Sequence, residues 1–329
     1  MNVYIQLADY IDSMHKNPYH KKHDENRPFV KIFRRLLTEE QAQAALLLGA
    51  DPIGVEAFAK KAGMDPETAR KLLFNLAKKG VAFVDNNGGE DIYSLLPFCP
   101  GIMESLYSEY LDDEISRYLQ EYVDELNDFI YGGERTIVMN TPVEAKIYHS
   151  SFEEAMYYLK KGSVFSLSDC LCRTAKEKLG QACGHTIKDV CIQVGPLSKY
   201  YVRTGRAHYV SFEEAVQVLE RSREEGLYFE ISHAMSGDDS YFICSCCPCC
   251  CIAMRTVLPG SIRREEPASK YLAQIDVALC TGCGHCEAEC PAKAIGAAEG
   301  SWQVNGARCI GCGLCCIYCK NGAISIVER

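Results

Sequence analysis

The stretch that decides the fold lies near the C-terminus, where two runs repeat the same cysteine spacing. They read CTGCGHCEAECPAKAI (residues 280–295) and CIGCGLCCIYCKNGAI (residues 309–324). Each run has the spacing C-x2-C-x2-C-x3-C, and matching positions are offset by 29 residues, from the first cysteine to the final Ala-Ile. Coincidence does not produce such a register, so we expect a duplicated unit that binds metal.

This spacing is that of the bacterial two-cluster ferredoxin run, in which thiolates hold [4Fe-4S] clusters. Three cysteines at two-residue gaps wrap three corners of one cluster, and the fourth reaches the other cluster. Structural zinc sites lack this duplicated run. We expect one cluster on Cys280, Cys283, Cys286 and Cys319, and a second on Cys309, Cys312, Cys315 and Cys290. Each fourth cysteine should begin a short helix, and the loops should use positive φ angles at Gly282, Gly284, Gly311 and Gly313.

Two positions depart from the repeat. Lys320 stands where the first run has Pro291, and Cys316 is an additional thiol beside Cys315. Proline removes a backbone donor, so a lysine would restore an N–H near the sulfur atoms and add positive charge. Both changes raise the potential of a nearby cluster. We expect Cys316 to be a buried spectator rather than a ligand, and His285 to face solvent.

The composition fits a metal-binding protein. The chain has 329 residues and 20 cysteines, nearly all of them at or after Cys170. Asp9 and Asp12 interrupt the N-terminal stretch where a signal peptide is apolar, and no run of about 18 apolar residues predicts a membrane span. Thiols stay reduced in a chain that is not exported, so we expect a cytoplasmic iron–sulfur protein of an anaerobe.

Ten further cysteines precede the ferredoxin runs. Four are spread over residues 170–191, and six fall within FICSCCPCCC (242–251). Six thiols in eight residues cannot all point one way on a strand, and Pro248 interrupts regular structure, so a loop around a metal centre is favoured. The candidate ligands are Cys170, Cys172, Cys183, Cys191, Cys244, Cys246, Cys247, Cys249, Cys250 and Cys251.

The spacing does not divide these ten thiols among metals. Two further [4Fe-4S] clusters and one larger non-cubane assembly are both consistent with them, and the first four also fit zinc. His185 is either a ligand or a structural histidine. Arg173 follows the C-x-C directly, and it either donates hydrogen bonds to an anionic cluster or substrate or is an ordinary surface or interface arginine.

The N-terminal region predicts a winged helix-turn-helix over about residues 38–97. The sequence TEEQ (38–41) is a capping box at the start of a helix, and DP (65–66) begins another. Two strand-like stretches then flank NNGG (86–89), which is a hairpin signal.

The charge pattern makes DNA an unlikely partner. The formal net charge is −9, whereas DNA-binding surfaces are usually basic. The hairpin carries Asp85, Glu90 and Asp91, and an acidic helix expected over about residues 101–131 has Arg117 as its one base. Such a surface repels a polyanion. We therefore expect a structural or protein-docking module, since fold does not imply function.

From about residue 133 the pattern alternates between strands and helices. Expected strands are RTIVMN (135–140), SVFSLS (163–168), LYFEIS (227–232) and YFIC (241–244), and expected helices are residues 151–162 and 211–226. The predicted fold class is α+β, in three domains. They are residues 1–132, helical with the winged-helix-like domain and the acidic helix; residues 133–266, a cysteine-rich α/β domain; and residues 267–329, a two-[4Fe-4S] ferredoxin-like domain.

The layout resembles a family of ferredoxin-type 4Fe-4S proteins of strict anaerobes. Those proteins combine a winged-helix-like N-terminal region, a C-x-C-R middle domain, a C-x-C-C-x-C-C-C run and a two-cluster ferredoxin domain. The matching residues here are LLPFCPGI (95–102), CLCR (170–173), FICSCCPCCC (242–251) and the eight ferredoxin cysteines. The resemblance covers nearly the whole chain and implies electron transfer in anaerobic metabolism, without fixing a reaction. Cys99 has no ferredoxin role and is expected to be buried.

No nucleotide-cofactor motif is present, since the chain has no G-x-G-x-x-G after a strand and no Walker A run. We expect an oxidoreductase component that passes low-potential electrons through the C-terminal clusters to the central metal centre and on to a partner protein. One alternative is a reductase whose central iron–sulfur cluster is the active site. Another is a redox-sensing winged-helix regulator.

Overall fold

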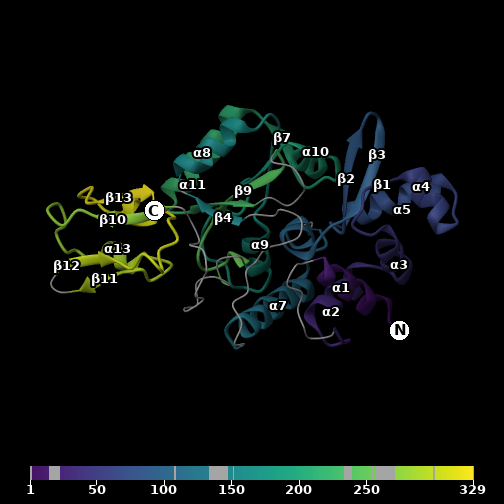
Figure 1. Cartoon of the computed structure of the whole chain (residues 1–329), viewed down its shortest axis with the longest axis horizontal. Helices are drawn as coiled ribbons and strands as arrows, with labels where there is room; N and C mark the ends of the chain where they lie inside the picture. Colours follow the sequence, from purple (N-terminus) through teal and green to yellow (C-terminus); the bar gives the residue numbers. More distant parts are fainter. Residues whose placement is uncertain are drawn as a thin grey trace.

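The computed structural model describes residues 2–14, 23–106, 109–132, 147–150, 152–232, 239–252, 255, 271–298 and 301–328. Figure 1 shows these parts following one another along the long axis of the molecule. N-terminal helices and a hairpin lie at one end, a six-stranded sheet lies between, and two small two-stranded sheets lie at the other end. Within the described residues, no helix has the length and apolar character needed to cross a membrane.

The N-terminal part contains the elements expected over residues 38–97. Its helices and strands are α1 (Val3–Ser13), α2 (Pro28–Leu36), α3 (Glu39–Leu48), β1 (Ile53–Gly54), α4 (Val55–Ala62), α5 (Pro66–Lys78), β2 (Ala82–Asn87) and β3 (Glu90–Leu95). Thr38 and Gln41 form the predicted capping box of α3. The strands pair in the order β1-β3-β2, and Gly88 and Gly89 close the β2–β3 hairpin with φ angles of 64° and 97°.

The acidic helix begins later than expected. The chain first forms η1 (Phe98–Ile102), a π-helical turn, and the short α6 (Met103–Ser105), and α7 spans Asp113–Gly132. The predicted start at residue 101 is wrong for two reasons. Leu106 takes an extended conformation that ends α6, and the Asp112 carboxylate accepts the Ile115 N–H at 2.9 Å, which caps a new helix.

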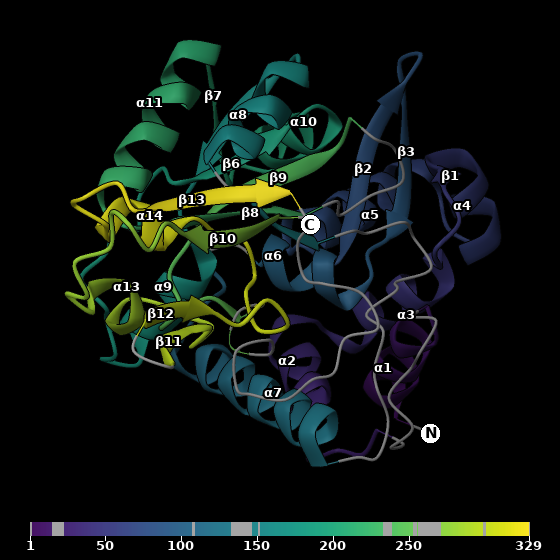
Figure 2. The same cartoon turned by 60° about the vertical axis from the view of Figure 1, so that its left-hand side comes forward.

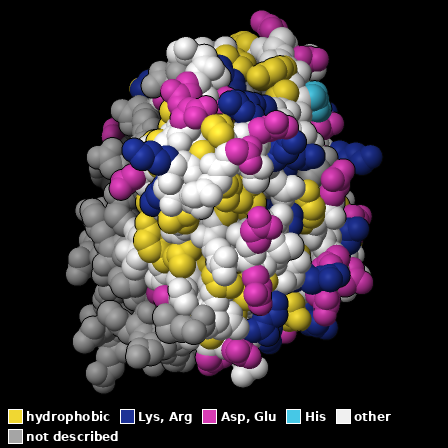
Figure 3. All heavy atoms as spheres, turned by 90° about the vertical axis from the view of Figure 1, so that its right-hand side faces the viewer, with side chains coloured by type: hydrophobic (Ala, Val, Ile, Leu, Met, Phe, Trp, Pro, Cys, Tyr) yellow, Lys and Arg dark blue, Asp and Glu magenta, His cyan; other side chains and the backbone are white. Residues whose placement is uncertain are grey.

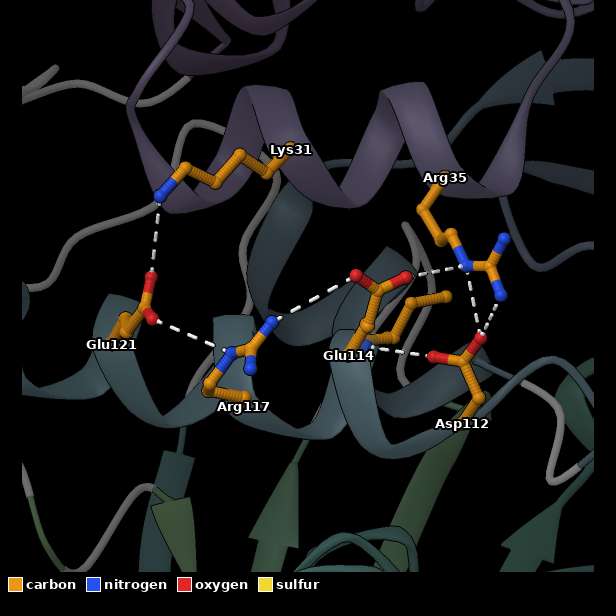
Figure 4. Close-up of polar contacts among 7 residues, drawn as sticks. Lys31, Arg35, Asp112, Glu114, Arg117 and Glu121 are labelled. Carbon is orange, nitrogen blue, oxygen red and sulfur yellow. Dashed lines mark hydrogen bonds and ion pairs between the residues drawn. The ribbon is translucent and has the colours of Figure 1, made fainter.

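The basic side chains of α2 pair with the acidic side chains of α7 (Figure 4). Lys31 lies 3.6 Å from Glu121, and Arg35 lies 2.7 Å from Asp112 and 3.2 Å from Glu114. These carboxylates therefore belong to an interface between two helices of this chain, which the sequence alone did not indicate.

The middle part is built on a six-stranded antiparallel sheet. Its strands are β4 (Ile147–Ser150), β5 (Phe165–Ser168), β6 (Cys191–Val194), β7 (His208–Val210), β8 (Tyr228–Ser232) and β9 (Tyr241–Cys246), in the order β4-β8-β9-β6-β5-β7. Its helices are α8 (Phe152–Lys161), α9 (Leu171–Lys178), α10 (Pro196–Arg203) and α11 (Phe212–Glu224). The expected helices and three of the expected strands are confirmed, whereas the strand predicted over residues 135–140 lies outside the described residues.

The two faces of this sheet have different chemistry, because successive side chains of a strand point to opposite faces. One face is apolar, with Phe229 and Ile231 of β8 and Ile243 of β9, and it packs against α8 and α11. The opposite face carries thiols and polar groups, including Glu230 of β8 and Cys244 of β9. The sheet therefore presents its cysteines on the side away from α8 and α11.

The C-terminal part repeats one unit twice. Its elements are β10 (Tyr271–Ile275), α13 (His285–Ala288), β11 (Ile295–Ala298), β12 (Ser301–Val304), α14 (Leu314–Tyr318) and β13 (Ile324–Glu328). The outer strands β10 and β13 pair with each other, and β11 pairs with β12, both antiparallel. The mixture of helices and antiparallel sheets throughout the chain confirms the α+β class.

Buried cores join the middle part to both ends. Figure 2 shows the C-terminal strands β10 and β13 in front and the N-terminal hairpin β2–β3 to the right. On the N-terminal side, the Tyr200 hydroxyl lies 3.0 Å from the Ala82 carbonyl oxygen, and Arg203 makes a two-pronged ion pair with Asp91 at 2.7 and 2.5 Å. On the C-terminal side, Tyr228 belongs to the same apolar core as the ferredoxin runs. The hairpin tip region is thus held against α10 by a charged pair.

Candidate metal centres

The ferredoxin loops have the backbone conformation that the sequence predicted. Gly282 and Gly284 have φ angles of 71° and 76°, and the equivalent Gly311 and Gly313 have 66° and 77°. The expectation that each fourth cysteine begins a helix is wrong. The short helices α13 and α14 start directly after Gly284 and Gly313 instead, so each helix contains the third cysteine and ends before or at the fourth.

The structure brings a cysteine of the second run to the first three of the other run. A cavity of about 20 Å³ is lined by Cys280, Cys283, Cys286 and Cys319, together with Trp302. His285 is exposed there, as expected, and its hydrogen bonds to the Cys283 sulfur lower the pKa of that thiol to about 7.

The remaining four ferredoxin cysteines form a second group. Burial raises the pKa of the Cys312 thiol to about 12, and the neighbouring Cys290 and Cys309 act in the same direction. Cys315 also interacts with Cys309 and Cys312. Crossed ligation, in which the fourth cysteine of one run joins the first three of the other, requires these four cysteines to be neighbours. The ligand assignment itself remains a prediction.

Backbone N–H groups point at several of these sulfur atoms. Ala294 donates to Cys290 at 3.3 Å, and Ala323, at the equivalent position of the second run, donates to Cys319 at 3.2 Å. Cys309 accepts from the Ala273 N–H at 3.4 Å. Hydrogen bonds to cluster sulfurs raise reduction potentials, so the duplicated Ala-Ile after each run has a physical role that the sequence comparison did not reveal.

A row of side chains crosses the sheet on its thiol face. Register pairs Glu230 with Cys244, Cys244 with Cys191, and Cys191 with Ser168. Directly opposed residues share a face, and the sulfur atoms of Cys191 and Cys244 lie 3.8 Å apart. Cys246 points to the same face because it is two residues along β9 from Cys244.

Seven cysteines line one cavity on this face. Its volume is about 70 Å³, and these cysteines are Cys170, Cys172, Cys191, Cys244, Cys246, Cys247 and Cys251. Cys170 precedes α9 as its N-cap and Cys172 lies in the first turn of that helix. Interactions between neighbouring thiols run from Cys170 through Cys172, Cys251, Cys246 and Cys244 to Cys191. We call these six residues the ring thiols.

The other four central cysteines converge at a neighbouring point, and one of them, Cys247, also lines the ring cavity. The sulfur atoms of Cys183, Cys247, Cys249 and Cys250 all lie within 4.8 Å of one another, and those of Cys183 and Cys247 are 3.9 Å apart. We call them the compact quartet. Hydrogen bonding with Cys250, opposed by burial, lowers the pKa of the Cys247 thiol to about 4.

The FICSCCPCCC run is therefore not a loop throughout. Its first two cysteines, Cys244 and Cys246, are on β9, and the chain turns at Pro248, as expected. The strand cysteines face the ring cavity, the three cysteines of the turn belong to the quartet, and Cys251, after the turn, lines the ring cavity again. His185 is not a member of either group, and the side chain of Cys99 lies outside what the structure describes.

Arg173 lies between the ring thiols and the compact quartet. It is 2% exposed, so the interpretation as a surface arginine is wrong. Its Nη1 donates to the Ser245 carbonyl oxygen at 2.9 Å, whereas Nε and Nη2 are buried without a hydrogen-bond partner. Burial opposes the charge, but Cys170 and Cys247 raise the pKa of the guanidinium.

Glu230 is a site residue that the sequence analysis missed. It is 5% exposed and lies 3.8 Å from the Cys251 sulfur. Burial, followed by Cys251 and Cys244, raises the pKa of this carboxyl well above its ordinary value. The sequence LYFEIS carried a signal for this residue. Successive side chains of a strand point to opposite faces, so a glutamate between apolar neighbours indicates that the other face of the sheet is polar.

Comparison with protein families identifies one match. The model of a 4Fe-4S binding domain matches residues 272–295, which contain the first four ferredoxin cysteines. Comparison with curated proteins and with solved structures gives no significant match. The matched segment and the cysteine groups together support an iron–sulfur protein.

Proposed function

We propose that this protein transfers low-potential electrons from a soluble one-electron donor, through two C-terminal [4Fe-4S] clusters, to a metal centre on the ring thiols, and on to a partner protein. One observation carries the proposal. Cys246 and Cys251 of the ring pack in the same buried core as Cys286, Cys290 and Cys315 of the ferredoxin runs. Close packing between two thiol-lined sites shortens the path for electron transfer between them.

The C-terminal ligands are those predicted, Cys280, Cys283, Cys286 and Cys319 for one cluster, and Cys309, Cys312, Cys315 and Cys290 for the other. Such clusters supply one-electron transfer when bound. The role of the chain is to hold the thiolates, to bury Cys286 and Cys290, and to donate the Ala294 and Ala323 N–H groups to sulfur. The first cavity and the matched 4Fe-4S segment both support this assignment.

The ring thiols fit an anionic iron–sulfur centre. The six ring sulfur atoms exceed the four that a cubane takes, and the adjacent Arg173 supplies a buried positive charge. A guanidinium in such a place lowers the cost of holding several thiolates away from water. We place the protein in the cytoplasm of an anaerobe, where thiols stay reduced and can bind metal.

The N-terminal part is proposed as a winged-helix-like module that docks within the protein or onto a partner, not onto DNA. The β2–β3 hairpin, which would approach a phosphate backbone, is instead held to α10 through Asp91 and Arg203. On the face shown in Figure 3, Lys and Arg side chains alternate with Asp and Glu and form no continuous basic patch. Polyanion binding depends on such a patch.

Anaerobic rapid mixing tests the proposal. Protein mixed with a reduced viologen dye should show bleaching of the C-terminal clusters, followed by a second, slower change from the central centre. In Cys312→Ser the second change should be lost or slowed at least about tenfold, whereas the control Cys316→Ser should behave like the parent. Equal rates of central reduction in all three proteins would overturn the proposed route.

One observation favours a second candidate, a reductase that uses the ring thiols as its active site. The ring cavity shares Glu104, Ser168 and Asp169 with an open hollow of about 330 Å³, which also contains Arg206 and His208. Small molecules could reach the ring from there. A spectrum of the central centre that changes when small oxidised substrates are added would favour the reductase, and an unchanged spectrum would favour a carrier.

A further inference from the structure

We propose that the compact quartet, Cys183, Cys247, Cys249 and Cys250, binds a single tetrahedral zinc ion, separate from every iron–sulfur centre of the protein. This inference does not rest on the proposed electron transfer. It divides the ten central cysteines into six that hold a redox centre and four that hold a structural ion.

The spacing of the sulfur atoms carries the inference. A zinc–sulfur bond of about 2.3 Å in tetrahedral geometry places the four sulfur atoms about 3.8 Å apart. The four sulfur atoms lie within 4.8 Å of one another, and Cys183 and Cys247 are 3.9 Å apart. In a cubane each thiolate binds a different iron, so its sulfur atoms lie farther apart than four that share one ion. Among the described ferredoxin-run cysteines, no three converge within 4.8 Å.

Two segments distant in sequence meet at the quartet. Cys247, Cys249 and Cys250 come from the turn after β9, which the Cys251 N–H closes by donating to the Cys247 carbonyl oxygen at 3.1 Å. Cys247 and Cys250 are 1% and 2% exposed and pack on Leu227. The ion would therefore fasten the turn to the loop that carries Cys183.

Hydrogen bonds within the protein hold that loop. Glu225, at the end of α11, accepts hydrogen bonds from the Thr186 N–H at 3.1 Å and from its hydroxyl at 2.6 Å. The Cys170 N–H donates to the Ile187 carbonyl oxygen at 2.8 Å. These contacts present Cys183 to the turn and complete a four-thiolate set, which is the usual closed form of structural zinc.

A closed set of four thiolates is the usual ligand set of structural zinc, and it also fits a single iron ion, so the metal analysis below separates the two. Four thiolates on a divalent ion leave a net charge of about −2, and the buried Arg173 beside Cys247 offsets part of that charge.

Metal analysis of the full-length protein, purified anaerobically from zinc-containing medium, tests the inference without a variant. We expect about one zinc per chain in addition to iron, and cobalt-grown protein should show the absorption of tetrahedral Co²⁺ bound to thiolates. Protein with full iron but no zinc overturns the proposal. A high-spin iron signal of a single tetrahedral thiolate site also overturns it.

The variant test uses Cys249→Ser, because Cys249 is exposed and its replacement leaves no cavity. We expect zinc to fall at least about fivefold while iron is unchanged, and the control Cys316→Ser should retain both. Loss of about four irons with Cys249→Ser would assign the quartet to a cluster instead. Because C-terminal clusters can be reduced with or without zinc, failure here leaves the dye-mixing result intact, and the two proposals fail separately.

Discussion

The guanidinium of Arg173 donates a hydrogen bond of 2.9 Å to the backbone carbonyl oxygen of Ser245, the residue between two ring cysteines on β9. This bond fixes the first turn of α9 to the sheet. It also places a positive charge beside Cys170 on one side and Cys247 on the other. A single buried side chain thus joins the ring thiols to the compact quartet.

Replacement of Arg173 should act on the central centre and spare the ferredoxin clusters. Arg173→Met removes the charge that balances the thiolates, so we expect a more negative midpoint potential for the central centre and about 3 kcal/mol lower stability. Arg173→Lys keeps the charge and should restore part of the potential. Redox titration followed by EPR measures both. A central potential that is the same in all three proteins would contradict this role.

Crossed ligation predicts which variants resemble each other. Cys319→Ser should damage the same cluster as Cys283→Ser, because both side chains line one cavity, and Cys290→Ser should damage the same cluster as Cys312→Ser. Each variant should lose up to about four irons. EPR spectra of the reduced variants give the comparison, with Cys316→Ser as the control. Pairing of Cys319→Ser with Cys312→Ser would refute the crossing.

Asp91 should make the stability of the N-terminal part depend on pH. The hydrogen bond from Arg203 lowers the pKa of this carboxyl below its ordinary value of 3.8. Its stabilisation is therefore complete above that value and is lost as the pH falls through the lower pKa of the folded state. Asp91 is nearly buried, but Arg203 is 38% exposed and screened by solvent.

We accordingly expect Asp91→Asn to lower the free energy of unfolding by about 1 kcal/mol at neutral pH. The difference from the parent should shrink as the pH falls below about 4. Anaerobic urea unfolding followed by circular dichroism measures it, with Asp85→Asn on the same hairpin as the control. A difference that grows on acidification would show that the ion pair is not its source.

Gly226 should control the contact between the middle and C-terminal parts. A Cβ atom there would lie 2.2 Å from the Tyr318 hydroxyl oxygen, and the residue has a φ angle of 73°. Gly180 provides a matched control, because its φ angle is 68° and nothing lies within 4 Å of its Cβ position. Both alanine variants carry about 1 kcal/mol of backbone strain.

Any loss of stability in Gly226→Ala beyond that in Gly180→Ala therefore comes from the clash with Tyr318. We expect a larger fall in melting temperature and slower reduction of the central centre, since the residues that hold the two sites together are pushed apart. Rapid mixing with a reduced dye measures the second effect. Identical behaviour of the two variants would show that Tyr318 does not contribute to this contact.

The ferredoxin runs could be predicted from sequence because their ligand geometry is local. Cysteines separated by two residues, one of them glycine, define one loop whatever surrounds it, and the positive φ angles of Gly282 and Gly311 follow. Even there, local reasoning misplaced the short helices. They start after the second glycine of each loop, so the third cysteine is helical and the fourth is not.

The division of the central cysteines depends on long-range pairing, which no local pattern contains. Cys191 joins the ring only because β6 pairs with β9 in the register that opposes it to Cys244. Cys183 joins the quartet only because its loop is tied to Glu225 at the end of α11. The alternation of side chains along β9 could have predicted that Cys244 and Cys246 share a face of the sheet. It could not have predicted which cysteines of other elements lie beside them.

Lys320 allows the last departure from the ferredoxin repeat to be tested. Among the described residues, the N–H···S hydrogen bond to Cys319 comes from Ala323 and not from Lys320, so the charge of Lys320 remains as the reason for a raised potential. Lys320 is exposed, and salt screens such a charge.

We expect Lys320→Gln to lower the midpoint potential of the cluster that includes Cys319, by more at low ionic strength than at high. Lys320→Pro, which recreates the first run, should give the same shift. Protein-film voltammetry at two salt concentrations measures it. A shift with proline but none with glutamine would mean that the backbone N–H acts after all, and an unchanged potential in both variants would sink the hypothesis that this lysine tunes the cluster.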